Sequence, residues 1–143
     1  MDAASTITTL SVAPRQTDRM LRLSTAFGRD ALVAEALEGF EAVGRGGFRL
    51  SVTALATDAF LDLDAPLGDT VLVELLTAES RVALRSFHGH VTAFERVGAN
   101  GGLARYRLVI EPWLVFLGHR HDSFIIQDMS VVEIAESLFA DWQ

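Results

Sequence analysis

The chain has 143 residues, of which 50% are hydrophobic and none is cysteine, and its formal net charge is −7. This length suits one domain with one core, and the apolar content excludes disorder over most of the chain. The lack of cysteine excludes disulfides and thiolate metal sites. The negative charge opposes binding to nucleic acid, no apolar run is long enough for a membrane-spanning segment, and the N-terminal residues lack the features of a secretory signal.

The N-terminal residues 1–18 mix Ser, Thr, Ala and Pro without a repeating pattern. We expect them to form a flexible lead-in to a domain over residues 19–143. From Met20 to Phe27 apolar side chains alternate with polar ones, which predicts a half-buried strand. Gly28 interrupts this pattern.

The next stretch, ALVAEALEGFEAVG at residues 31–44, suits two kinds of element. Its Ala, Leu and Glu content suits a helix, whereas the glycines inside and around it suit a bent strand, and we favour the strand. The GRGG tetrapeptide at residues 44–47 predicts a turn. Apolar residues then recur at every second position from Phe48 to Ala56, which predicts another strand.

Residues 58–68, DAFLDLDAPLG, form an acidic connector. The short apolar run Val71–Leu76 after it predicts a strand that is covered on both faces. After a turn at residues 77–80, an alternating pattern begins at Arg81 and continues through FHGHVTAFERV. This pattern predicts one long strand, bent at Gly89.

The dipeptide Asn100-Gly101 tolerates the positive φ angles of a tight hairpin turn, so the strands on either side of it are expected to pair antiparallel. The return strand places Tyr106 and its alternate neighbours on one face and Arg105 and Arg107 on the other. Pro112 ends this strand because it has no N–H to donate to the ladder.

Two helical segments follow the return strand. WLVFLG predicts a single helical turn that ends at Gly118. Ser130 and Glu133 then form a capping box, and Met129 and Ile134 are placed as a hydrophobic staple. An apolar stripe indicates an amphipathic helix with an acidic outer face; its members are Val131, Ile134, Ala135, Leu138, Phe139 and Trp142. The predicted fold is α+β, mainly β: a curled antiparallel sheet or small β-barrel with one C-terminal amphipathic helix.

Four histidines form two His-x-His pairs, His88 with His90 and His119 with His121. Imidazoles at alternate positions of a strand share one face and are able to share a metal ion, so a metal-binding barrel is one alternative function. Against it, no Asp or Glu lies within the first pair, and nothing in the sequence brings the two pairs together. No catalytic residue and no cofactor is predicted, because the chain has neither a nucleophile elbow nor a phosphate-binding loop.

A short span after Pro112 is rich in large apolar residues: Trp113, Phe116, Leu117, Phe124, Ile125 and Ile126. We interpret them as core, and the alternative is a surface between subunits, where aromatic side chains carry much of the binding energy. Phe87, Tyr106 and Trp113 are expected to support packing. Trp113 or Trp142 as a stacking platform for a sugar would instead make the protein a glycan-binding module.

Two stretches of this sequence resemble a known family. They are RSFHGHVTAFERV at residues 85–97 and ARYRLVIEPWLVFLGHRHDSFIIQDMSVVEIAESLF at residues 104–139. The segment from Arg81 to Leu138 is similar to the N-terminal hub domain of VgrG proteins, which are spike components of type VI secretion, and to phage tail hub and late-control proteins. The connector FLDLDAPLG shares the likeness, whereas residues 1–57 share only the strand pattern.

This resemblance implies a structural protein without catalysis, assembled as a homotrimer that joins a tube protein to the spike. It also implies spike-tip or effector proteins as partners, assembly in the cytoplasm, and ejection by a route without a signal peptide. Further hub segments, an OB-fold and a β-helical spike are expected to follow, so that residues 19–143 form only the N-terminal part of the hub. The structural or interface residues carried over are Phe87, Gly89, Tyr106, Pro112, Trp113, Leu117, Gln127, Ser130 and Glu133.

Overall fold

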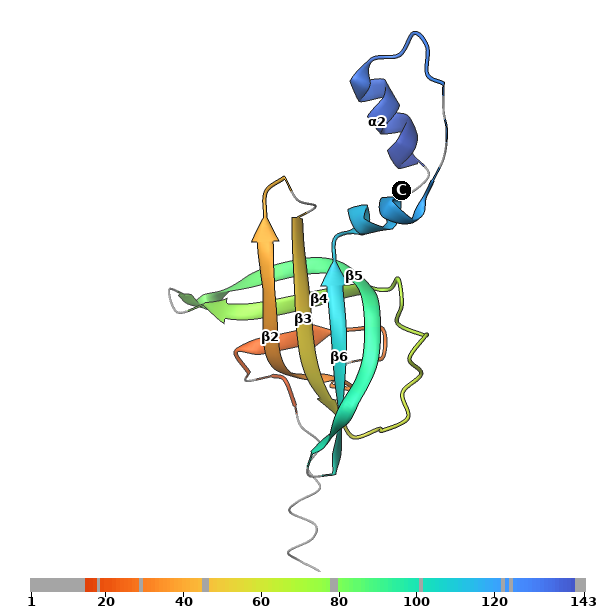
Figure 1. The fold of residues 1–143 in the computed structure, drawn as a ribbon. Helices are drawn as coiled ribbons and strands as arrows, with labels where there is room; N and C mark the ends of the chain where they lie inside the picture. The colour runs from red at the N-terminus through yellow and green to blue at the C-terminus, as the bar shows by residue number, and fades with distance from the viewer. Residues whose placement is uncertain are drawn as a thin grey trace, which may run out of the picture.

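Six strands, one 3-10 helix and one α-helix make up the described part of the chain (Figure 1). Their bounds are β1 Leu21–Ser24, β2 Val33–Ala42, β3 Gly47–Ala56, β4 Thr70–Thr77, β5 Ser80–Asn100, β6 Leu103–Glu111, η1 Trp113–His119 and α2 Val131–Phe139. The structure is a computed structural model that describes residues 15–17, 19–28, 30–44, 47–77, 80–100, 102–121, 123 and 125–140. No helix in these ranges is long and apolar enough to cross a membrane.

The strands form a single antiparallel sheet in the order β1-β4-β5-β6-β3-β2. The 21-residue strand β5 pairs with β4 as far as His90 and with β6 from His90 onward. Figure 1 shows β5 curving from the β4 layer round to β6, so one strand belongs to both layers of a half-barrel. The predicted curled antiparallel sheet is confirmed, and β5 is the single long strand that the alternating pattern indicates.

The core fills the inside of this half-barrel. Alternate residues of β3 and β6 point inward, and Tyr106 is fully buried. Arg105 and Arg107 point outward from β6 and pair with Glu35 and Glu95. The buried apolar side chains are Leu23, Leu32, Val33, Ala34, Leu50, Val52, Ala54, Ala56, Val71, Val73, Phe87, Val91, Phe94, Ala104, Tyr106, Leu108 and Ile110.

Strand β4 corrects one prediction. Its residues Val71 and Val73 are buried, but Leu72 and Glu74, which alternate with them, are only half-buried. The expectation that β4 is covered on both faces is therefore wrong. One face lies on the core, and the side chains of the other face remain partly open to solvent.

Strand β1 is shorter than the alternating pattern predicts. It ends at Ser24, and the chain turns at Thr25–Phe27, where the carbonyl of Thr25 accepts a hydrogen bond from the N–H of Gly28 at 3.2 Å. Gly28 adopts a φ of 101°, which favours glycine. Phe27 nevertheless packs inward, with its ring 5.7 Å from that of Phe94. Alternation therefore predicts the inward direction of its side chain correctly, but not that its backbone lies in a turn.

Strand β2 confirms the preference for a strand over a helix at residues 31–44. It pairs with β3 along its whole length, and the register shifts between Ala34 and Ala36. A shift of this kind is a bulge, which bends a strand, so the bend lies near Ala34–Ala36 and not at a glycine.

The hairpin between β5 and β6 forms as predicted, but its turn lies one residue later. Asn100 is already paired with Leu103, so it belongs to the strand and the turn follows it. Gly102 supplies a positive φ of 86°. Gly101, like residues 45 and 46 of the GRGG turn, lies outside the described residues.

The residues just before β1 close the seam between the two edge strands. Gln16 is buried, although it falls within residues 1–18, and its side-chain amide donates to the carbonyls of Leu23 on β1 and Leu32 just before β2 at 2.9 and 3.0 Å. Its side-chain oxygen accepts from the N–H of Leu23 at 2.6 Å. Arg19 donates to the carbonyl of Ala34 on β2 at 2.9 Å. Side chains thus join β1 to β2 where the ladder itself is not continuous.

Gly89 lies where no side chain fits. A Cβ at this position would lie 2.8 Å from the carbonyl oxygen of Glu111, 2.9 Å from Ile110 and 3.0 Å from the ring of Phe48. We expect Gly89→Ala to lower the free energy of unfolding by about 1–3 kcal/mol, the usual effect of overpacking. Urea denaturation measures this loss.

Gly98 supplies the matched control for this prediction. It lies on the same strand, and a Cβ there would meet no atom within 4 Å. Gly98→Ala is expected to be neutral or to stabilise by up to about 1 kcal/mol through the unfolded chain. Equal losses in the two variants would show that the packing around Gly89 is not the cause.

Candidate assembly surface

The chain leaves the sheet at Pro112 and forms a separate C-terminal arm, residues 112–140. Pro112 adopts a φ of −62° and an extended ψ, and its carbonyl accepts from the N–H of Val115 at 3.0 Å, which begins η1. The helical turn predicted after Pro112 is confirmed. It continues through Gly118 to His119, so the expected end at Gly118 is one residue short.

Helix α2 begins with the predicted capping box. The hydroxyl of Ser130 accepts from the N–H of Glu133 at 3.3 Å, and the carboxylate of Glu133 accepts from the N–H of Ser130 at 2.7 Å. The pKa of Glu133 is held below its usual value, mainly by the hydrogen bond from the Ser130 side chain and to a lesser extent by the one from the Ser130 backbone. Residues close in sequence make all of these contacts, so the start of α2 does not depend on the sheet.

The arm has almost no contact with the core. Neither η1 nor α2 contains a buried residue, and Figure 1 shows α2 beyond the end of the sheet, folded back over η1. The rings of Trp113 and Phe139 meet edge to face at 5.3 Å and join the two helices. The exposed large apolar residues of the arm are Trp113, Leu114, Ile125, Ile126, Met129, Val131, Val132 and Leu138.

The interpretation of this apolar span as core is therefore wrong. Trp113 is 36% exposed and Ile125 is 91% exposed, while Phe116 and Leu117 are half-buried. The core cluster consists of side chains from the sheet and from Leu32, and it includes no described residue of the arm. Phe124 and Trp142 lie outside the described residues.

The other predicted structural residues divide between core and arm. Phe87 is buried, with its ring 5.8 Å from that of Phe48 and the guanidinium of Arg85 lying over it at 4.9 Å. Pro112 is half-buried at the base of the arm, and Gln127 is exposed in its linker. The structure brings Phe87 and Gly89 together beside Phe48, whereas Gln127 belongs to the arm.

The structure does not bring the two histidine pairs together as one set of metal ligands. His90 is half-buried, its Nδ1 lies 2.9 Å from the carbonyl oxygen of Gly68, and its ring lies edge-on to Phe116 at 5.4 Å. The ring of His119 lies 6.5 Å from the same Phe116, while His88 and His121 are exposed. Across the described ranges, no three His, Asp or Glu side chains lie close enough together to hold a metal ion.

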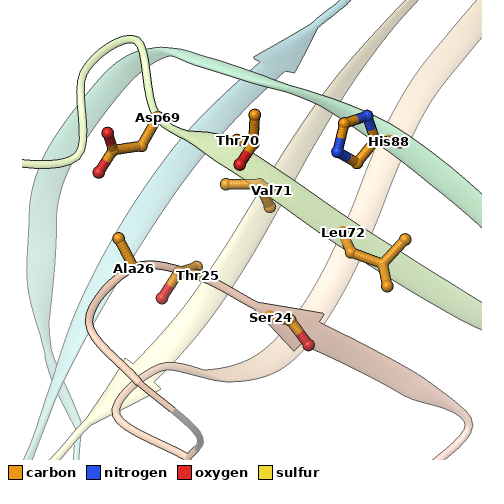
Figure 2. Close-up of a pocket in the computed structure, with 8 residues that line it drawn as sticks. All are labelled: Ser24, Thr25, Ala26, Asp69, Thr70, Val71, Leu72 and His88. Atoms are coloured by element: carbon orange, nitrogen blue, oxygen red, sulfur yellow. The ribbon is translucent and has the colours of Figure 1, made fainter.

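A cavity of about 410 Å³ opens where β1 ends and β4 continues (Figure 2). Its lining residues are Ser24, Thr25, Ala26, Asp69, Thr70, Val71, Leu72 and His88. Figure 2 shows the carboxylate of Asp69 and the ring of His88 at opposite ends of this cavity. Asp69 and His88 are therefore not placed as an acid–base pair.

The described geometry is a half-barrel with an apolar arm, and comparison with known proteins gives its family. The family model of the phage tail baseplate hub (GPD) matches residues 41–143. The chain belongs to this family. The predicted resemblance to VgrG and phage tail hub proteins is thereby confirmed, and the match includes the whole arm.

Relatives of this hub-family chain include two spike proteins of Pseudomonas aeruginosa. The type VI secretion system spike protein VgrG1b is 30% identical over 130 residues, or 91% of this chain, and VgrG1c is 32% identical over 127 residues, or 88% of it. The chain spans 17% of the length of each. The family and these relatives are hub and spike proteins, which supports the predicted structural role of the chain.

A solved structure shows the same fold. It is a component of the E. coli type VI secretion system, described as structurally similar to the bacteriophage T4 tail proteins gp27 and gp5. The TM-score is 0.69 at 21% identity, and the alignment covers 87% of this chain and 32% of the other. The likeness establishes the half-barrel of the hub family for this chain.

Sequence reasoning missed two features of this hub chain. Gln16 closes the seam, and no local pattern marks it among the Ser, Thr and Pro residues around it. Phe60, in the connector before β4, is 89% exposed. The sequence offered a signal for this exposure. Phe and Leu alternate with Asp in a connector, where no strand is present to bury the apolar side chains.

Proposed function

We propose that this chain forms part of a trimeric hub that joins the tube of a contractile injection apparatus to its spike. The family match and the names of the P. aeruginosa relatives support this role. Under this proposal the partners are two further copies of the chain, a tube protein, and spike-tip or effector proteins. The hub assembles in the cytoplasm and leaves through the apparatus without a signal peptide.

The exposed apolar arm is the observation that carries the proposal of self-assembly. Val131 is 81% exposed and Ile125 is 91% exposed. Burying each such side chain contributes about 1.5–3 kcal/mol, and neither is covered by the chain that bears it. Aromatic and aliphatic side chains gathered on one projecting element form the apolar centre of an interface. The arm of one copy therefore packs against a neighbouring copy.

A substitution in the arm tests this assembly. Val131 is the first residue of α2, where a negative charge favours the helix, so Val131→Asp is expected to leave the helix intact. We expect size-exclusion chromatography with light scattering to give three times the chain mass of 15.6 kDa for the wild type. The same measurement should give the single mass for Val131→Asp.

Met20→Asp is the matched control, because Met20 is also exposed but lies before β1, outside the arm. It should keep the wild-type mass. A wild type that stays monomeric at every concentration would contradict the proposed trimer of this chain. A Val131→Asp variant that remains trimeric would show that the arm is not the contact.

A further inference from the structure

We propose that the connector between β3 and β4, residues 57–69, is a second docking surface, and that it takes a protein other than a second copy of this chain. The partner would offer an apolar pocket rimmed by basic side chains. The inference rests on the proposed function, which requires the hub to hold a tube subunit as well as its own copies. We assign the connector to that subunit.

The connector is fixed to the core from beneath. The hydroxyl of buried Tyr106 accepts from the N–H of Leu61 at 3.2 Å and donates to the carbonyl of Asp58 at 3.1 Å. Arg96 donates to the carbonyl of Ala59 at 2.8 Å. Pro66 is fully buried. The segment has neither helix nor strand, yet its path is set by β5 and β6.

The same anchoring points three large apolar side chains outward. Phe60 is 89% exposed, and Leu63 and Leu67 are also exposed, while Leu61 packs against the core. The connector thus turns Leu61 and Pro66 inward and presents Phe60, Leu63 and Leu67 to solvent. A rigid aromatic side chain loses little conformational freedom on binding, and such anchors dominate protein interfaces. Phe60 is the anchor of this surface.

The charge around Phe60 selects the partner. The connector carries four acids, Asp58, Asp62, Asp64 and Asp69, and no basic residue. A second copy, with its net charge of −7, would bring like charge to this face, which costs free energy. A basic rim around an apolar pocket is complementary to both features. This charge argument favours a different protein over self-association at the connector.

Binding of the purified tube subunit of the same apparatus, measured by isothermal titration calorimetry, tests the inference. Phe60→Ala should weaken binding at least tenfold, the effect of losing a hot-spot side chain. The backbone N–H of Phe60, which donates to Asp58 at 2.8 Å, is kept in this variant, so the connector should retain its shape. Met20→Ala, another exposed apolar residue before β1, should bind like the wild type.

A charge variant tests the partner's chemistry separately. The carboxylate of Asp62 accepts from the N–H of Asp64 at 3.0 Å, and Asp62→Asn keeps that acceptor while removing the charge. We expect a several-fold loss of affinity for the tube subunit and a weaker dependence of affinity on salt, as for the loss of a charge at an interface rim. If the salt dependence of the affinity did not change, the proposal that basic side chains rim the partner's pocket would be overturned.

The outcomes separate this inference from the proposed function. If the wild type binds the tube subunit and Phe60→Ala binds equally well, the connector is not the docking surface and the proposed function stands. If Phe60→Ala instead converts the trimer to monomers, the occupant is a second copy and the assignment to another protein is overturned. If the wild type does not bind the tube subunit, tube docking by this chain fails, and the connector's assignment fails with it.

Discussion

Tyr106→Ala is expected to lower the free energy of unfolding by about 3–5 kcal/mol, as for other fully buried aromatic residues. Its side chain is 0% exposed, and its ring stacks on that of Phe94 with centroids 5.2 Å apart. Deleting the ring opens a cavity at the centre of the half-barrel and also releases the connector. Urea denaturation followed by circular dichroism measures the loss.

Tyr106→Phe separates the ring from the hydroxyl. It keeps the stacking on Phe94 and removes only the two hydrogen bonds to Leu61 and Asp58. We expect a loss of about 1–3 kcal/mol, because the N–H of Leu61 and the carbonyl of Asp58 lose a partner. If Tyr106→Ala cost no more than Tyr106→Phe, the ring would not be part of the core.

Gln16→Ala is expected to lower the free energy of unfolding by about 2–4 kcal/mol. The substitution leaves the N–H of Leu23 and the carbonyls of Leu23 and Leu32 without their side-chain partner. Buried polar groups left unsatisfied cost about 1–3 kcal/mol each, reduced where water reaches them. Thermal unfolding gives the total loss, and hydrogen exchange should show faster exchange at the edges of β1 and β2.

Two variants control this result. Thr17→Ala changes an exposed neighbouring side chain and should stay within ~0.5 kcal/mol of the wild type. Gln16→Glu keeps the shape of the side chain but sets a carboxylate oxygen against two carbonyl oxygens, so it should cost more than Gln16→Ala. A Gln16→Glu variant as stable as the wild type would show that these carbonyls do not need the amide donor.

The seam explains how an open sheet supports the proposed hub. The sheet order places β1 and β2 at opposite ends, and open strand edges invite pairing with other chains. Gln16 and Arg19 occupy backbone groups on both edge strands. This occupation leaves fewer free backbone groups at the seam, and it is consistent with the proposed association through the side-chain surfaces of the arm and the connector.

Alternation predicted the strands well where both neighbours in the sheet are strands. Leu50, Val52 and Ala54 on β3 face the core as their spacing predicts. At the edge of the sheet the same pattern overestimated the length of the strand. It predicts a strand from Met20 to Phe27, but β1 has only four residues. An edge strand lasts only while a partner faces it, and β1 departs from β4 after Ser24.

The candidate surface was harder to predict than the fold. The apolar span that includes Trp113 and Ile125 has the composition of a core, and hydrophobicity alone does not show whether a side chain faces its own sheet or another subunit. The resemblance between the chain and the hub family indicated the structural role, but not that most apolar side chains of the arm stay exposed outside the core. No pattern in the sequence predicts that Gln16 is buried.

The sequence by itself determined the local elements: the period of β3 and β6, the glycine-rich hairpin after Asn100, and the capping box of α2. The signal for each of these elements lies in residues a few positions apart, so it is readable without knowing what distant segments pack against them. Only the tertiary structure decided that the arm is exposed, that Gln16 joins β1 to β2, and that Phe60 faces outward. Whether a residue is buried depends on which distant segments pack against it. The core has a limited volume, and once the strands have filled it, other apolar side chains remain outside.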